Sequence, residues 1–148
     1  MLLRVSLISK ILLALDDSAR APRVAAAGGL LAARFGASLH PLRVVLLRPG
    51  SATNDALPES QARDASSALA ELSRSLMDAL VAPPRVRVGE PWRVIVELAN
   101  EIGADLIVLG ARGQHEDALG ATASGVLAHA LQDVFLVRDA VRRSVLPS

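Results

Sequence analysis

Residues 103–113 read Gly-Ala-Asp-Leu-Ile-Val-Leu-Gly-Ala-Arg-Gly, and this stretch decides the fold class. Its centre, residues 106–109, is wholly apolar, which is typical of a strand buried on both faces of a parallel sheet. Gly103 suits the position just past the end of a helix, because glycine tolerates the left-handed backbone conformation found there. The glycines after the strand begin a loop that leads into another helical segment. A helix, a buried strand, a glycine-bearing loop and a second helix in succession predict an α/β fold.

The same alternation extends towards both ends of the chain. Five short apolar runs are separated by four longer segments in which apolar residues recur at helical spacing. This pattern indicates βαβ units, and it predicts an open, doubly wound parallel sheet of five strands with helices on both faces. The expected strands are residues 10–15, 39–47, 85–88, 106–109 and 134–138, and the expected helices are residues 22–35, 59–81, 92–102 and 121–131.

Prolines and glycines refine these expectations. Pro41 predicts a late start of the second strand or a local break in its pairing, because proline has no amide hydrogen to donate. Pro83 and Pro84 are expected to end the long second helix. The pair Gly28-Gly29 lies inside a helical pattern and lacks the spacing of a dinucleotide-binding fingerprint, so it predicts close packing of that helix.

The composition fits one domain and excludes several classes of partner. We expect a single domain over residues 1–148, with a core at about residues 10–139 and a tail at residues 140–148. The chain has no cysteine, which removes disulfides and thiolate metal sites. A net charge of +1 and only one tryptophan and two phenylalanines provide neither a basic face nor a stacking platform. No nucleic acid is therefore expected as a partner.

The apolar N-terminus admits two interpretations. Residues 1–15 combine an early arginine with an apolar run, as a secretory signal peptide does. Lys10 interrupts that run, no small-residue cleavage site follows before the acids at residues 16 and 17, and residues 10–15 make a better buried strand. No stretch approaches the roughly 18 uninterrupted apolar residues of a membrane helix. We therefore expect a cytoplasmic protein that does not contact a membrane.

Two loops are expected to face each other across one cleft. In open parallel sheets, ligands bind beyond the carboxyl ends of the strands, at the point where the strand order reverses. The first strand ends in Asp-Asp-Ser at residues 16–18, and the fourth is followed by Gly110, Gly113 and Gly120. Glycine amides before a helix favour a phosphate, and the aspartate can accept a hydrogen bond from an adenine amino group or a ribose hydroxyl. The alternatives are that the glycines only form turns and that residues 16–18 only cap a helix.

Taken together, these segments resemble the universal stress protein family. The resemblance runs in the family's order through residues 11–18, 36–39, 88–91, 103–113, 126–130 and 134–138. It covers nearly all of residues 10–139, and residues 103–113 are its most distinctive part. It implies an adenine-nucleotide alpha-hydrolase-like fold with strand order 3-2-1-4-5 and two helices on each face. It also implies ATP or another adenine nucleotide as ligand, with no metal beyond nucleotide-associated Mg²⁺.

The glycine loop departs from the pattern of the family's nucleotide-binding members, Gly-x2-Gly-x9-Gly-Ser/Thr. Gly110 and Gly113 match it, but only six residues separate Gly113 from Gly120, and Ala121 stands at the hydroxyl position. A second alignment keeps nine residues and places Ala-Ser at residues 123–124 there, which restores the hydroxyl and loses the glycine. The resemblance implies as nucleotide-facing positions Asp16, Val44, Leu109, Gly110, Gly113, Gly120 and Ala121, with Thr122 offering a hydroxyl one position late.

The resemblance implies a stress-response or regulatory protein, and the shortened glycine loop predicts that it binds an adenine nucleotide weakly and without catalysis. The alternative is an ATP-binding member that acts as a nucleotide-dependent switch. No enzyme is expected, because no nucleophile or general base stands beside the glycine loop and no Gly-x4-Gly-Lys-Ser/Thr motif occurs. His40 and His129 have no evident catalytic partner and are taken as structural, as is Trp92. The consecutive His-Glu-Asp at residues 115–117 is a poor metal site, since neighbouring residues seldom share one ion.

The fifth strand, residues 134–138, is predicted to lie at an edge of the sheet. Its sequence Val-Phe-Leu-Val-Arg leaves unpaired backbone groups exposed there unless another segment covers them. Members of the resembled family commonly pair this edge across a two-fold axis, which implies a homodimer. The tail, with Arg142 and Arg143, can instead fold back over the edge, and a further protein partner stays open.

Overall fold

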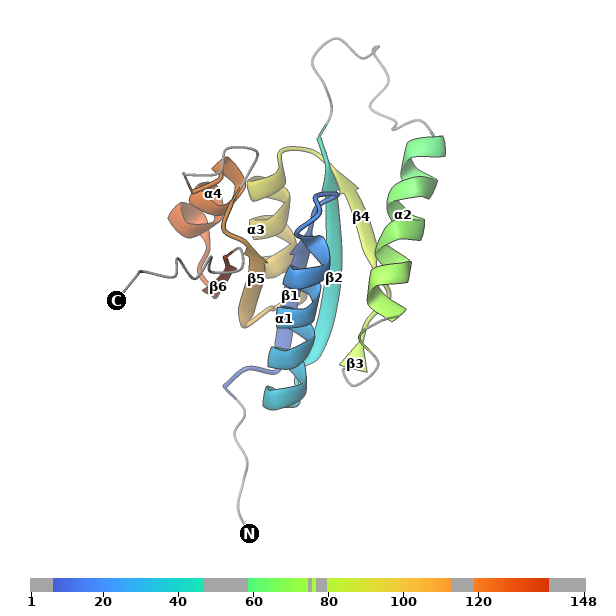
Figure 1. The fold of residues 1–148 in the computed structure, drawn as a ribbon. Helices are drawn as coiled ribbons and strands as arrows, with labels where there is room; N and C mark the ends of the chain where they lie inside the picture. The colour runs from blue at the N-terminus through green and yellow to red at the C-terminus, as the bar shows by residue number, and fades with distance from the viewer. Residues whose placement is uncertain (1–6, 47–58, 75, 77–79, 113–118, 139–148) are drawn as a thin grey trace, which may run out of the picture.

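Figure 1 shows a twisted sheet with helices on both faces. The computed structural model describes residues 7–46, 59–74, 76, 80–112 and 119–138. The strands of these residues are β1 (Lys10–Leu15), β2 (Ser38–Val45), β3 (Leu80–Val81), β4 (Arg85–Val88), β5 (Leu106–Gly110) and β6 (Asp133–Val137). The helices are α1 (Ala21–Phe35), α2 (Glu59–Arg74), α3 (Pro91–Ile102) and α4 (Ala121–His129). The strand order is β3-β2-β1-β5-β6, with β4 also paired to β2, and each of these pairings is parallel.

The predicted strand order is confirmed, with one strand more than expected. The five predicted strands correspond to β1, β2, β4, β5 and β6, which follow the order 3-2-1-4-5. The additional strand β3 pairs with the start of β2, and β4 pairs with its end. Pro83 and Pro84 separate the two pieces because neither proline has an amide hydrogen for the ladder. The third strand is therefore two short segments along one edge.

The second helix is shorter than its apolar spacing predicted. α2 ends at Arg74, whereas the spacing extended the prediction to residue 81. Leu80 and Val81 form β3 instead, because pairing with β2 satisfies backbone groups that the sheet would otherwise leave open. Leu76 still reaches the core from outside the helix. α4 likewise ends at His129, two residues before the predicted end at residue 131. Tertiary pairing overrides local periodicity here.

Pro41 lies inside β2 and marks a gap in its pairing. Leu39 O accepts a hydrogen bond from Ala82 N–H, and Val45 O accepts one from Gly89 N–H. Odd-numbered residues of β2 therefore turn their backbone groups towards β3 and β4. Pro41 faces the interval between those two strands, where no amide donor is required. The predicted break in pairing is confirmed, and the predicted late start is wrong, because β2 begins at residue 38.

Two apolar layers confirm the prediction of two helices on each face. One layer holds Ile11, Leu13, Leu39 and Val108 against α1 and α2, and the other holds Leu12, Leu42, Ile107 and Leu109 against α3 and α4. Successive strand residues thus alternate between the layers, as the pleat requires. The close packing predicted for Gly28 is confirmed, since a Cβ there would lie 2.7 Å from Leu13 Cδ1. No helix in the described ranges is both long enough and apolar enough to cross a membrane.

Asp105 ties the amino-terminal ends of β1 and β5 together. Its Oδ2 accepts hydrogen bonds from Ser9 N–H at 2.9 Å, from Ser9 O–H at 3.0 Å and from Lys10 N–H at 3.0 Å. These donors, the Ser9 amide first, lower the pKa of Asp105 because they stabilise its carboxylate. Lys10, the lone lysine, also donates from Nζ to Ile102 O at 3.0 Å. This end of the sheet is therefore closed by structural contacts, and the opposite end is left for a ligand.

Candidate functional site

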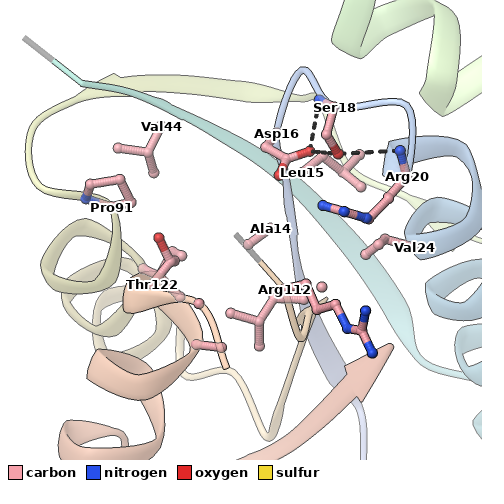
Figure 2. Close-up of a pocket in the computed structure, with 15 residues that line it drawn as sticks. Ala14, Leu15, Asp16, Ser18, Arg20, Val24, Val44, Pro91, Arg112 and Thr122 are labelled. Atoms are coloured by element: carbon pink, nitrogen blue, oxygen red, sulfur yellow. Dashed lines mark hydrogen bonds between the residues drawn. The ribbon is translucent and has the colours of Figure 1, made fainter. Parts of the chain in front are cut away.

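A cleft lies at the carboxyl ends of β1 and β5, where the strand order reverses. From this point the chain continues to β2 on one side and to β6 on the other, with α1 on one face of the sheet and α3 and α4 on the other. The cavity has a volume of about 140 Å³. Its lining, drawn in Figure 2, consists of Ala14, Leu15, Asp16, Ser18, Arg20, Val24, Val44, Pro91, Ile95, Leu109, Gly110, Arg112, Gly120, Thr122 and Ala123.

The turn between β1 and α1 forms one wall of the cleft. Ser18 donates to Asp16 Oδ1 from its amide at 3.0 Å and from its hydroxyl at 2.6 Å. The same hydroxyl accepts a hydrogen bond from Arg20 N–H at 3.2 Å. Arg20 is the N-cap residue of α1 and its side chain makes no capping bond. Helix capping by residues 16–18 is therefore wrong, because α1 starts too late for them, and their side chains fix the turn instead.

A short antiparallel bridge closes the base of the loop between β5 and α4. Arg112 pairs with Leu119, and Gly120 N–H donates to Ala111 O at 2.9 Å. These contacts hold Gly120 at the cleft as the N-cap residue of α4. No side chain caps this helix, and its first turn contains no acid. Its amides and the positive end of its dipole favour an anion at the cleft.

Six of the eight residues predicted to face a nucleotide line this one cavity. They are Asp16, Val44, Leu109, Gly110, Gly120 and Thr122. Ala121 is exposed and is not part of the lining, and Gly113 lies outside the described residues. Figure 2 shows the hydroxyl of Thr122 on the side of the cavity near Pro91, so the hydroxyl reaches the cavity from the position after Ala121. Nucleotide binding by these residues stays a prediction.

Two arginines of the lining were not among the predicted positions. Arg20 comes from the turn before α1, and Arg112 follows β5. Figure 2 shows both guanidinium groups on the α1 side of the cavity, away from Val44 and Pro91. Arg112 belongs to the stretch 103–113, so its place beside the glycines was a usable signal. Arg20 is one of fifteen arginines, and only the geometry of the turn identifies it.

A second hollow of about 520 Å³ lies on the other side of the β1–α1 turn, against α2. Its charged lining consists of Asp16, Asp17, Glu71 and Arg43. Arg43 forms an ion pair with Asp17 at 3.4 Å. Three carboxylates against one guanidinium disfavour an anionic ligand. The smaller cavity, with a helix N-terminus and two arginines, is the better candidate for a nucleotide.

The histidines described by the structure lie away from the cleft. His129 stacks on Trp92 with 4.2 Å between ring centroids, and its Nδ1 lies 2.9 Å from Gly125 O. Trp92 of α3 thus packs against α4, which agrees with the structural role expected for it. His40 lies within β2. The described residues contain no group of three potential metal ligands, and the His-Glu-Asp at residues 115–117 lies outside them.

We expect His40 to make stability depend on pH on the acidic side of its ordinary pKa. Burial lowers the pKa of His40 below 6.5, and the charges of Arg85 and Lys10 lower it further. Below pH 6.5, His40 binds a proton in the unfolded chain but stays neutral in the folded chain until the pH reaches its lower folded-state pKa. The contribution of neutral His40 to the free energy of unfolding is therefore fully present above pH 6.5. It decreases as the pH falls towards the lower folded-state pKa. Thermal unfolding at about pH 7.5 and 5.5 should show that stability decreases less for His40→Gln than for the wild type between these two pH values. Equal decreases would contradict this prediction.

A doubly wound parallel sheet with a cleft at the reversal point defines a class of α/β proteins that bind small ligands at the carboxyl edge. The model of the universal stress protein family matches residues 8–138. This chain belongs to the universal stress protein family.

Solved structures of the same family have the same fold. The universal stress protein UspA from Lactobacillus plantarum is 28% identical, with a TM-score of 0.76 over 88% of this chain and 98% of that chain. A universal stress protein from Archaeoglobus fulgidus in complex with dAMP is 26% identical, with a TM-score of 0.64 over 87% of this chain and 96% of that chain. A universal stress protein in complex with cAMP, at 22% identity and a TM-score of 0.72 over 91% of this chain and 100% of that chain, shares the fold. No curated protein sequence matches the chain.

Proposed function

We propose that this universal stress protein binds an adenine nucleotide between β1 and β5 and acts as a regulatory or stress-response protein. The observation that carries the proposal is the convergence of Asp16 and the N-terminus of α4 on one cavity. Val44 and Ile95 supply an apolar surface for a base. The carboxylate of Asp16 suits a ribose hydroxyl or an adenine amino group. The dAMP complex of the Archaeoglobus fulgidus protein supports this choice of ligand.

A triphosphate is a poor fit to this site. With a volume of about 140 Å³, the cavity has less room for a chain of three phosphates than for a single phosphate. Ala121 brings no hydroxyl to the start of α4, and its position is outside the lining. We therefore propose ATP as a weak ligand. The ATP-dependent switch is the less supported function.

The chemistry of the lining supports binding without catalysis. Its ionisable side chains are those of Asp16, Arg20 and Arg112. A guanidinium stays protonated at neutral pH and cannot act as a general base. The hydroxyl of Ser18 donates to Asp16 Oδ1, and that oxygen also accepts the Ser18 amide. These hydrogen bonds fix the turn, and the described lining has no histidine or lysine beside Ser18, so we propose no hydrolysis or transfer.

Calorimetric titration with ATP, ADP and AMP tests the proposed function. AMP is expected to bind, and ATP is expected to have a Kd weaker than about 1 mM. Lengthening the loop between Gly113 and Gly120 to the family's nine residues, together with Ala121→Ser, is expected to strengthen ATP binding because it adds amide and hydroxyl donors.

Two aspartate variants provide the matched comparison. Asp16→Ala is expected to weaken AMP binding, whereas Asp17→Ala, which alters the second hollow, is expected to leave it unchanged. A Kd for ATP tighter than about 1 mM in the unmodified chain would contradict the weak-ATP prediction. No heat with any of the three nucleotides would contradict the proposed function itself.

We further propose that two copies pair through β6. This strand is at the end of the strand order, so one row of its backbone groups has no neighbour within the described sheet. Phe135 is 43% exposed on one side of it, and Leu131 is 87% exposed just before it. A two-fold axis beside β6 would pair the strands antiparallel and cover these side chains. The tail that was the alternative cover lies outside the described residues.

A further inference from the structure

We infer that Arg20 and Arg112 hold the phosphate of a nucleoside monophosphate in the cleft, an assignment that rests on the proposed nucleotide-binding function. The two arginines lie on different segments, and the fold brings both to one cavity. The anion would thus be recognised by two guanidinium side chains as well as by backbone amides. Figure 2 shows both guanidinium groups on the α1 side of the cavity, whose lining also includes Gly120 at the start of α4.

Both arginines of the lining lie on one side of the cavity, where Val24 also lies (Figure 2). Val44 and Pro91 lie on the α3 side in Figure 2, and Arg20 and Arg112 lie on the α1 side. A planar base gains from burial against Val44 and Pro91, whereas a phosphate gains from charge-assisted hydrogen bonds to the two arginines. This division selects a compact ligand with an apolar ring at one end and an anion at the other. Adenosine 5′-monophosphate has these two parts.

The backbone at Arg20 is positioned by the turn that also fixes Asp16. The Ser18 hydroxyl donates a hydrogen bond to Asp16 Oδ1 and accepts one from the amide N–H of Arg20. The Ser18 side chain therefore fixes the side chain of Asp16 and the backbone of Arg20. The carboxylate of Asp16 and the guanidinium of Arg20 therefore reach the cavity from a single rigid segment. The carboxylate suits a hydroxyl or amino group, and the guanidinium suits an oxyanion.

The backbone at Arg112 is positioned by the pairing that also fixes the start of α4. Its bridge to Leu119 and the bond from Gly120 N–H to Ala111 O place the arginine and the helix N-terminus at the base of one loop. A phosphate between them would accept hydrogen bonds from a guanidinium and from helix amides. The charged residues of the described lining are Asp16 and the two arginines. A phosphate therefore meets more cationic than anionic side chains there.

Equilibrium titration of the full chain with AMP, adenosine and inorganic phosphate tests the assignment. The variants are Arg20→Gln, Arg112→Gln and Arg34→Gln. Arg34 lies in the last turn of α1, away from the cleft, so its variant is a control with the same loss of charge. Each cleft variant should weaken AMP binding about tenfold, the size of one hydrogen bond to a charged group, and leave adenosine binding unchanged. The Arg34 variant should bind AMP like the wild type.

The outcomes separate this inference from the function on which it rests. If adenosine binds the wild type as tightly as AMP does, or if all three variants bind AMP equally well, the arginine assignment is wrong and nucleotide binding in the cleft survives. If neither AMP nor adenosine binds, the proposed function and the inference both fail. Inorganic phosphate that binds as tightly as AMP would overturn the nucleotide part and identify a simple anion site. Circular dichroism of each variant shows whether a loss of binding reflects a loss of fold.

Discussion

The variant Gly125→Ala is expected to destabilise the chain by about 2 kcal/mol, although the same change in an open helix position is stabilising. Gly125 lies in α4, where alanine is preferred over glycine by about 1 kcal/mol. A Cβ at this position would lie 2.3 Å from Cγ and 2.6 Å from Cβ of Trp92. These atoms are near the root of the side chain and cannot move away by a change of rotamer alone. The helices α3 and α4 would have to separate.

The contacts of Trp92 oppose that movement. Its indole Nε1–H donates to Glu90 Oε1 at 2.8 Å, and its ring stacks on His129. Denaturant unfolding followed by far-ultraviolet circular dichroism measures the change, and this signal also remains in variants that lack the single tryptophan.

Two controls identify the clash as the cause. Ser124→Ala lies one residue earlier in the same helix, is exposed, and should be neutral or slightly stabilising. In a Trp92→Ala background the clash is gone, so Gly125→Ala should there become neutral or stabilising. Equal destabilisation in both backgrounds would show that Gly125 acts through something other than the indole.

The variant Phe135→Glu is expected to convert a dimer into a monomer. Phe135 lies on the edge strand β6 and is 43% exposed in the single chain. In the proposed two-fold pairing, the glutamate would bring two like charges to the interface and lose the apolar contact. The expected cost of at least 2 kcal/mol corresponds to about a thirtyfold weaker dimer. Sedimentation over a range of protein concentrations measures this shift.

The chain offers a closely matched control for this variant. Phe35, at the end of α1, is also 43% exposed, so Phe35→Glu repeats the chemical change away from β6. Leu136→Lys is a poorer test, because Leu136 packs against the layer under α3 and α4 and its loss would also weaken the fold. A wild type that sediments as a monomer, or a Phe135 variant that keeps its dimer, would remove β6 from the interface.

The sequence predicted most of the fold because the decisive signals were local. The apolar run at residues 106–109 and the glycine at position 103 marked a buried strand and a helix end, and the structure has β5 and a left-handed Gly103 with φ of 68° at these places. The predicted end of the second helix was wrong and β3 was not predicted, because the signal there was not local. Leu80 and Val81 fit a helical period, and only the exposed edge of β2 makes them a strand.

The fold class followed from the alternation of strands and helices, and the resemblance to the family added the strand order and six of the cavity residues, because strand ends and glycine loops occupy fixed places in this fold. The sequence by itself could not place Arg20 or explain Gly125. Arg20 reaches the cleft through a turn closed by the Ser18 hydroxyl, and Gly125 matters only because Trp92 of another helix lies against it. These roles are decided by the tertiary structure, because they arise from atoms that meet only after the helices pack on the sheet.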